Sequence, residues 1–187
     1  MDEKFLDVVD ESGKIIKVES RKNIHDKGLL HKEVHVWFVD TQNKIIFQHR
    51  GKNKETYPDS LDATVGGHVE IGSDYLDTAL KESLEETGAE INKKDLILID
   101  KIRSTSHDEI TDKTNNVLRA IYVYKLKAPI NSLREETGKA SGFEAYSAEQ
   151  LDNLSEEEKK KFIPAMINDE QLKLYKKIII NCKKNEN

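Results

Sequence analysis

Residues 66–89 read GGHVEIGSDYLDTALKESLEETGA and combine a glycine-rich turn, a helical pattern and a second glycine. Ser73 is the expected N-cap of the helix, because its hydroxyl can accept hydrogen bonds from the free amides of the first turn. Asp74 would then lie at the positive end of the helix dipole. Gly88 is the expected stop, since glycine readily adopts the left-handed conformation that ends a helix. This stretch therefore predicts a turn, a helix and a defined helix end.

Two faces of the expected helix differ in chemistry. One arc at helical spacing is expected to pack against a sheet, and it consists of Leu76, Ala79, Leu80, Ser83, Leu84 and Thr87. On an exposed face, Glu82, Glu85 and Glu86 stand at i, i+3 and i+4, where like charges cost about 0.2–0.5 kcal/mol per pair. Hard divalent cations favour such oxygen clusters. A solvated acidic face is the plain alternative in a chain that is 35% charged.

These residues resemble the box of the Nudix hydrolases, G-x5-E-x7-R-E-U-x-E-E-x-G-U, in which U is aliphatic. The positions that match in register are Gly67, Glu82, Glu85, Glu86 and Gly88, and those that depart from the pattern are Ser73, Lys81, Ser83 and Ala89. In the family, the first glutamate and the arginine form an ion pair that braces the helix. Here those positions hold Ser73 and Lys81, so we expect a less rigid brace. Lys81 would lean instead toward Glu85, one turn on, and toward Asp77 or Thr78 before it.

The resemblance implies an α/β fold: an α/β/α sandwich around a mixed sheet, with an N-terminal hairpin and C-terminal helices. It also implies that Glu82, Glu85 and Glu86 bind magnesium or manganese and carry catalysis. The carbonyl oxygens of Gly66 or Gly67 would complete the metal shell. We expect one domain over residues 1–187, comprising an extension at 1–32, the box at 66–89 and C-terminal helices at 148–187.

Composition limits the possible partners. The 187 residues include 30 basic and 35 acidic side chains, with a net charge of −5, so a nucleic-acid duplex is not an expected ligand. The chain has one cysteine and shows neither a long apolar run nor a signal peptide. A cytoplasmic protein without a membrane partner, monomeric or homodimeric, is the expectation.

Alternation and turn residues place the remaining elements. The expected strands are Phe5–Val9, Lys14–Val18, Val34–Val39, Lys44–Arg50, Leu61–Val65, Leu96–Ile102, Val117–Leu126 and Phe143–Tyr146. The segments Ser104–Asn116 and Asn131–Gly142 are expected to be polar loops. Helices are expected near Ala148–Phe162 and Asp169–Cys182, with fraying from Lys183 to Asn187. We expect Trp37 in the core and Cys182 as an inert, partly exposed thiol.

Residues 5–70 are also similar to a Nudix branch that includes type-1 isopentenyl diphosphate isomerase. The similarity includes His25, His31 and His68, which correspond to metal ligands of the isomerases; a structural or phosphate-facing role is the favoured interpretation here. The isomerases carry a catalytic cysteine where this chain has Gly66. An isomerase also needs an acid and a base on opposite faces of the alkene, and neither is evident, so isomerisation is the disfavoured alternative.

The favoured hypothesis is a magnesium-dependent hydrolase that cleaves a diphosphate bond in a nucleoside diphosphate or nucleotide derivative. Divalent cations neutralise the charge of the substrate and lower the pKa of a bound water. The basic candidates for substrate binding are Arg21, Arg50, Lys52, Lys54 and His68, and Glu109 is a possible additional carboxylate. The altered brace leaves open a non-catalytic module that binds a nucleotide or a protein.

Overall fold

The computed structural model describes residues 3–184, and in them nine strands form one mixed sheet. The strands are β1 (Phe5–Val9), β2 (Ile15–Ser20), β3 (His31–Val39), β4 (Ile45–Arg50), β5 (Leu61–Asp62), β6 (Val65–His68), β7 (Leu96–Asp108), β8 (Lys113–Lys125) and β9 (Ala140–Tyr146). Strand β3 is central: it pairs antiparallel with β1, β4 and β6, and parallel with β8.

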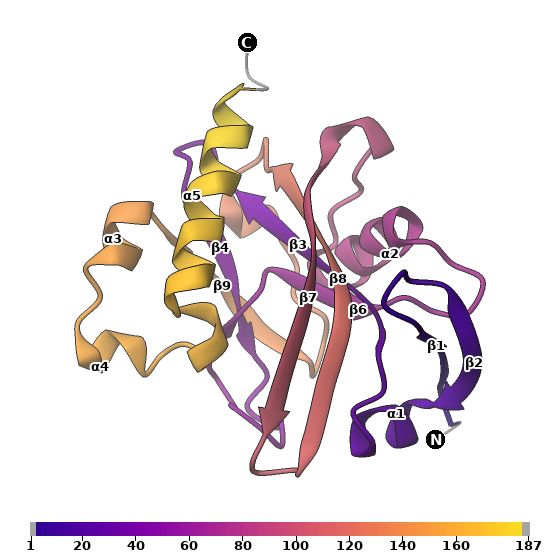
Figure 1. Ribbon diagram of the computed structural model, residues 1–187. Coiled ribbons are helices and arrows are strands. Elements are labelled where there is room, and N and C mark those ends of the chain that lie inside the picture. Colours follow the sequence, from indigo (N-terminus) through magenta and orange to yellow (C-terminus); the bar gives the residue numbers. More distant parts are fainter. Residues whose placement is uncertain (1–2, 185–187) are drawn as a thin grey trace.

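Helices cover both sides of this sheet (Figure 1). They are α1 (Arg21–Asp26), α2 (Tyr75–Thr87), α3 (Ala148–Asp152), α4 (Glu156–Lys159) and α5 (Asp169–Lys184), with short 3-10 turns at Lys93–Asp95, Ile130–Ser132 and Pro164–Met166. Helices α2 and α5 lie on opposite sides of the sheet in Figure 1. This arrangement confirms the predicted α/β/α sandwich around a mixed sheet.

Each face of β3 contributes to its own core. Val34, Val36 and Phe38 pack with the α2 side, whereas Trp37 and Val39 pack with the α5 side. Because alternate residues of a strand project to opposite faces, a strand covered on both sides is apolar at consecutive positions. Trp37 is fully buried, which confirms its expected place in the core.

The helix of the quoted stretch differs from the prediction at two points. Asp74, not Ser73, is the N-cap, and its carboxylate accepts a hydrogen bond from the amide of Asp77. Leu84 is 49% exposed, because the packed arc runs through Thr78, Ala79, Ser83 and Thr87. Gly88 ends the helix with φ of 67°, as predicted.

The prediction of a polar loop at Ser104–Asn116 is wrong. These residues continue β7 and β8, which stay paired as far as Asp108 and Lys113. Strand β3 accompanies β8 only from Val117 onward, so the outer part projects as a two-stranded arm beyond the sheet. Polar residues on both faces of this arm hid the strand period, because neither face is covered by a core.

The C-terminal region corrects several expectations. Residues 148–162 form two short helices instead of one, each starting with a serine capping box. Cys182 is buried at 3% exposure, not partly exposed. The predicted fraying falls partly on residues 185–187, which lie outside the described residues, while Lys183 and Lys184 belong to α5. Within residues 3–184, no helix is both long and apolar enough to span a bilayer.

Candidate active site

Glu82 and Glu86 of α2 meet the glycine backbone of β6. A carboxylate oxygen of Glu86, Oε2, accepts a hydrogen bond of 3.2 Å from the amide of Gly66. Glu82 lies against Gly67 so closely that a Cβ on Gly67 would be 2.5 Å from its Cγ and Cδ. The glycine at position 67 therefore makes the approach of this carboxylate possible.

Burial dominates the electrostatics of these two carboxyls. It raises the pKa of Glu86 to about 8, and the neighbouring Glu82 adds to the effect. The pKa of Glu82 is also raised, first by burial and then by the charge of Glu85. Within residues 3–184 neither carboxylate has an ion-pair partner closer than 4.0 Å. Two partly desolvated carboxyl groups that lie against the glycine backbone fit a hard divalent cation, which would stabilise their charged forms.

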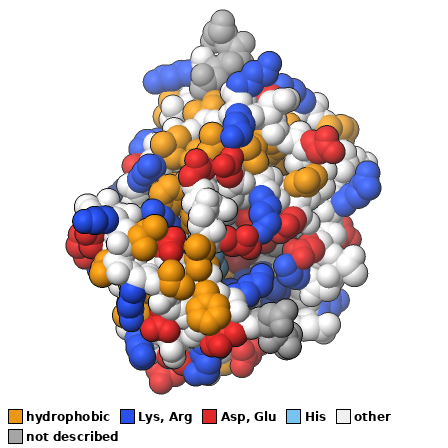
Figure 2. Space-filling model, turned by 90° about the vertical axis from the view of Figure 1, so that its right-hand side faces the viewer, with side chains coloured by type: hydrophobic (Ala, Val, Ile, Leu, Met, Phe, Trp, Pro, Cys, Tyr) orange, Lys and Arg blue, Asp and Glu red, His pale blue; other side chains and the backbone are white. Residues whose placement is uncertain are grey.

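A hollow of about 390 Å³ surrounds this pair. It gathers most of the residues that the sequence suggested: Arg21, Arg50, Lys54, Gly66, Gly67, His68, Glu82 and Glu86. Lys52, Glu85 and Glu109 are not part of its lining, and Glu85 is 48% exposed at its side chain. In Figure 2, acidic and basic side chains gather around a hollow near the middle of the face.

The two arginines of the hollow differ in their availability. Arg50 donates to Asp62 at 2.9 Å and to the carbonyl of Thr56 at 3.1 Å. Arg21, at the start of α1, has no ion-pair partner in the part of the chain that the structure describes. An unpaired guanidinium suits phosphate, which it can contact with two parallel hydrogen bonds.

Two polar residues that line the hollow, and an arginine that pairs with one of them, were missed at the sequence level. Glu33 and His35 project from β3 and are each 8% exposed, and Arg119 lies opposite Glu33 on β8. The Arg119 guanidinium donates to Glu33 Oε2 at 2.8 and 3.1 Å, and His35 Nε2 lies 3.7 Å from Glu33 Oε1. Burial alone would raise the pKa of Glu33, but Arg119 and His35 hold it well below its usual value.

His25, His31 and His68 form a second group beside the hollow, with ligand nitrogens within 4.8 Å of one another. His31 donates from Nδ1 to the carbonyl of Leu29 at 2.9 Å, which leaves Nε2 as an acceptor. Among residues 3–184, neither His31 Nε2 nor His68 Nε2 has a hydrogen-bond partner. Burial lowers the pKa of all three, that of His68 to about 3. These neutral imidazoles could also hold a cation.

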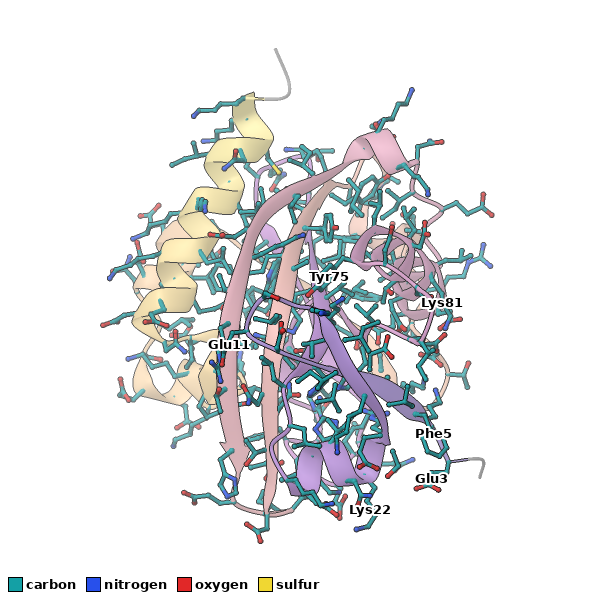
Figure 3. All side chains as sticks on the ribbon, turned by 45° about the vertical axis from the view of Figure 1, so that its right-hand side comes forward. Glu3, Phe5, Glu11, Lys22, Tyr75 and Lys81 are labelled. Carbon is teal, nitrogen blue, oxygen red and sulfur yellow. The ribbon has the colours of Figure 1, made fainter. Side chains whose placement is uncertain are left out.

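Lys81 keeps the expected contact with Glu85 only at the limit of an ion pair, and its short ion pair is with Glu70. Its Nζ lies 2.8 Å from Glu70 Oε1 and 4.0 Å from Glu85 Oε1. Glu70 lies just after β6, so the pair ties the turn before α2 to the middle of the helix, where Figure 3 labels Lys81. The brace is therefore rebuilt from Glu70 three residues earlier than the usual position, and Ser73 takes no part in it.

Comparisons with known proteins agree with this geometry. Residues 29–166 match the model of the NUDIX domain. The chain is 32% identical to an uncharacterised Nudix hydrolase of Clostridium acetobutylicum, over 81% of this chain and 73% of that protein. It is 27% identical to Nudix hydrolase 3 of Arabidopsis thaliana over 99% of its length, but spans only 24% of the plant protein.

The fold is also similar to solved structures. A crystal structure of DR0079 from Deinococcus radiodurans gives a TM-score of 0.69 at 18% identity, covering 94% of this chain and 99% of that one. A MutT protein from Methanosarcina mazei gives a TM-score of 0.58 at 13% identity, covering 79% and 93%. The match of the domain model over most of the chain, together with the glutamates of α2, shows that this protein belongs to the Nudix hydrolase family.

Proposed function

We propose that this protein is a magnesium- or manganese-dependent hydrolase of a diphosphate bond in a nucleoside diphosphate or nucleotide derivative. The observation that carries the proposal is the pair Glu82 and Glu86, held half-buried against the glycines of β6 without an ion-pair partner of their own among the described residues. Cations that lie nearby, Arg21 and Lys54, line the same hollow and suit a charged diphosphate.

Hydrolysis of a diphosphate requires the protein to hold an anionic substrate and a water molecule close together. A bound divalent ion would neutralise phosphate charge and lower the pKa of water. Glu82 and Glu86 would hold that ion, and the amide of Gly66 orients the Glu86 carboxylate. Glu85 would act from the solvent side, by positioning water or through its charge on Glu82. Arg21 would bind and orient the diphosphate. Orientation of this kind lowers the activation barrier, because the reacting atoms are already held in line.

The test is phosphate release from a panel of diphosphates in the presence of magnesium. Turnover of at least one nucleoside diphosphate or nucleotide derivative supports the proposal. Ligand binding without turnover on any member would favour a non-catalytic module instead. Isopentenyl diphosphate belongs in the panel, and no dimethylallyl isomer is expected, because Gly66 offers no side chain to move a proton.

Gly67→Ala should lower activity without affecting the folding of the protein. The new Cβ would be 2.5 Å from Glu82 Cγ and Cδ, so the flexible glutamate must move while the backbone can stay in place. We expect kcat/KM to fall by about tenfold or more, since ångström-scale misplacement of a reacting group is costly. Thermal unfolding should change little.

Gly66→Ala is the matched comparison. Its Cβ would lie 3.5 Å from His35 Cδ2, an ordinary contact, so the loss should be much smaller. Equal losses in the two variants would contradict the steric argument.

The Glu70–Lys81 pair should support activity modestly. Both side chains are about half exposed, at 49% and 43%, and exposed pairs contribute about 0.2–1 kcal/mol. We therefore expect Glu70→Gln and Lys81→Gln each to lower kcat/KM by about two- to fivefold. The double variant should lose little more, because either change already removes the pair.

A suitable control is Asp77→Asn, which breaks the 2.8 Å pair of α2 with Lys93 away from the glutamates. An additive double variant, or an equal loss in the control, would show that the glutamates are braced in another way.

A further inference from the structure

A tight turn at the start of β9 brings a lysine to the hollow at the glutamates. The chain folds back on itself there, because the amides of Lys139 and Ala140 both donate to the carbonyl of Glu136, at 3.0 and 3.2 Å. Gly138 has a φ of 78° in this turn, which glycine adopts without strain. The side chain of Lys139 lines the same hollow as the two buried glutamates of α2.

The backbone of this turn is anchored to the residue that follows β4. The amide of Gly51 donates to the carbonyl of Lys139 at 2.8 Å. A Cβ on Gly51 would lie 3.0 Å from that oxygen and 3.2 Å from the carbonyl oxygen of Gly138, so glycine permits the close approach. The side chain of Lys139, in contrast, is 57% exposed. The fold therefore fixes where the lysine starts and leaves its flexible stem free to adjust to a ligand.

Glu136 keeps the ammonium of Lys139 close to this position. Its Oε1 lies 2.6 Å from Lys139 Nζ. Its Oε2 is buried and has no hydrogen-bond partner among residues 3–184. Because loss of the lysine contact would leave the carboxylate still less satisfied, the pair should persist when a ligand binds. An ammonium has three N–H donors, and the pair with Glu136 leaves others for a ligand.

The charge of Lys139 also acts on the glutamates of α2. The pKa of Lys139 is raised first by its hydrogen bond to Glu136, and the charges of Glu136, Glu86 and Glu82 add to the effect. In return, Lys139 lowers the pKa of Glu82, although burial of that carboxyl has the larger, opposite effect. The ammonium thus supplies part of the positive charge that these carboxylates need.

One positive charge at this place should have opposite effects on the two ligands of the hollow. It repels a divalent cation that binds to Glu82 and Glu86, and so weakens the binding of the cation. It attracts a diphosphate in the same hollow and can donate charged hydrogen bonds to it, and so strengthens the binding of the diphosphate.

We propose that Lys139 balances the charge of Glu82 and Glu86 and binds the diphosphate of the substrate, so that it opposes a divalent cation that binds alone. This inference rests on the proposed function and adds a substrate-binding residue to it. The residue comes from the segment Asn131–Gly142, for which the sequence indicated only a polar loop.

Lys139→Gln tests the inference, because glutamine removes the charge and can still donate to Glu136. The Kd for Mn²⁺ without substrate, measured from the electron paramagnetic resonance signal of free Mn²⁺, should fall about three- to tenfold. The Kd for the uncleavable methylenediphosphonate at saturating magnesium, measured by calorimetry, should rise about tenfold, as expected for the loss of one charged hydrogen bond. A distorted or partly unfolded variant would weaken both ligands, so the opposite signs identify the charge.

Two further variants serve as controls. Lys139→Arg keeps the positive charge, so its affinity for Mn²⁺ should stay close to that of the wild type. Lys94→Gln removes an exposed lysine outside the lining of the hollow and should leave both affinities unchanged.

An unchanged or weaker affinity for Mn²⁺ in Lys139→Gln would overturn the inference, and so would an unchanged affinity for methylenediphosphonate. Absence of Mn²⁺ binding in the wild type would overturn it together with the metal assignment. Opposite shifts in the two affinities without turnover of any diphosphate would support the role of Lys139 and count against the proposed hydrolase alone.

Discussion

Glu86→Gln and Glu82→Gln should each lower magnesium-dependent kcat/KM by about a hundredfold or more, because even residues that only support metal ligands contribute about 10–100-fold. Glutamine keeps the size of the side chain but removes the charge that a divalent ion needs. The fold should persist, since the amide can still accept the hydrogen bond from Gly66. The measurement is initial rate against substrate at saturating magnesium, with circular dichroism as the check on folding.

Two further glutamates of the same region serve as comparisons. Glu85→Gln should cost less, because the Glu85 side chain is 48% exposed and does not line the hollow. Glu90→Gln, just beyond the helix and exposed, should leave the rate unchanged. Near-wild-type turnover in both the Glu82 and Glu86 variants would contradict the metal assignment and with it the proposed mechanism.

The parts of the fold that sequence predicted are those fixed by short-range rules. The helix stop at Gly88 follows from its φ of 67°, which glycine adopts without strain. The hairpin β1–β2 follows from two apolar runs around Gly13, which also has a positive φ, of 81°. Where two residues could satisfy one rule, the prediction failed: Ser73 and Asp74 both suit an N-cap, and the turn geometry selects Asp74.

Within the candidate site, spacing alone could bring residues together only along the helix. Glu82 and Glu86 share a periodic pattern, so spacing alone placed them together. Glu33 and Arg119 are 86 residues apart in sequence, and their pairing depends on the parallel register of β3 and β8. The one signal available was the polar series at alternate positions of β3. Glu70 was missed for a related reason, because a turn, not a helical spacing, brings it to Lys81.

The last prediction concerns the stability of the metal-free protein between pH 7 and 8.5. Burial raises the pKa of Glu86 from 4.5 to about 8, so the folded protein keeps a proton that the unfolded chain has already released. Since the folded state binds more protons, the free energy of unfolding falls as the pH rises from about 4.5 to about 8, by at most about 1.4 kcal/mol per pH unit.

His25, His31 and His68 have the opposite effect on the free energy of unfolding, and they exert it at lower pH. Their pKa values are lowered from 6.5, so they contribute stability that is present above that value and is lost on acidification. Above pH 7 this contribution is nearly constant, so the histidines no longer oppose the loss caused by Glu86. The raised pKa of Glu82 adds a smaller loss of the same sign.

Glu86→Gln isolates the effect, because glutamine does not titrate and the histidines are common to both proteins. In chelator, urea unfolding at several pH values should show the wild type losing stability above pH 7 relative to the variant. Magnesium should restore the wild type most at high pH, where the charged carboxylate is the binding form, and should restore the variant little. An equal pH dependence of the unfolding free energy in the two proteins would mean that Glu86 titrates normally. It would then not be a desolvated carboxylate available to bind a cation.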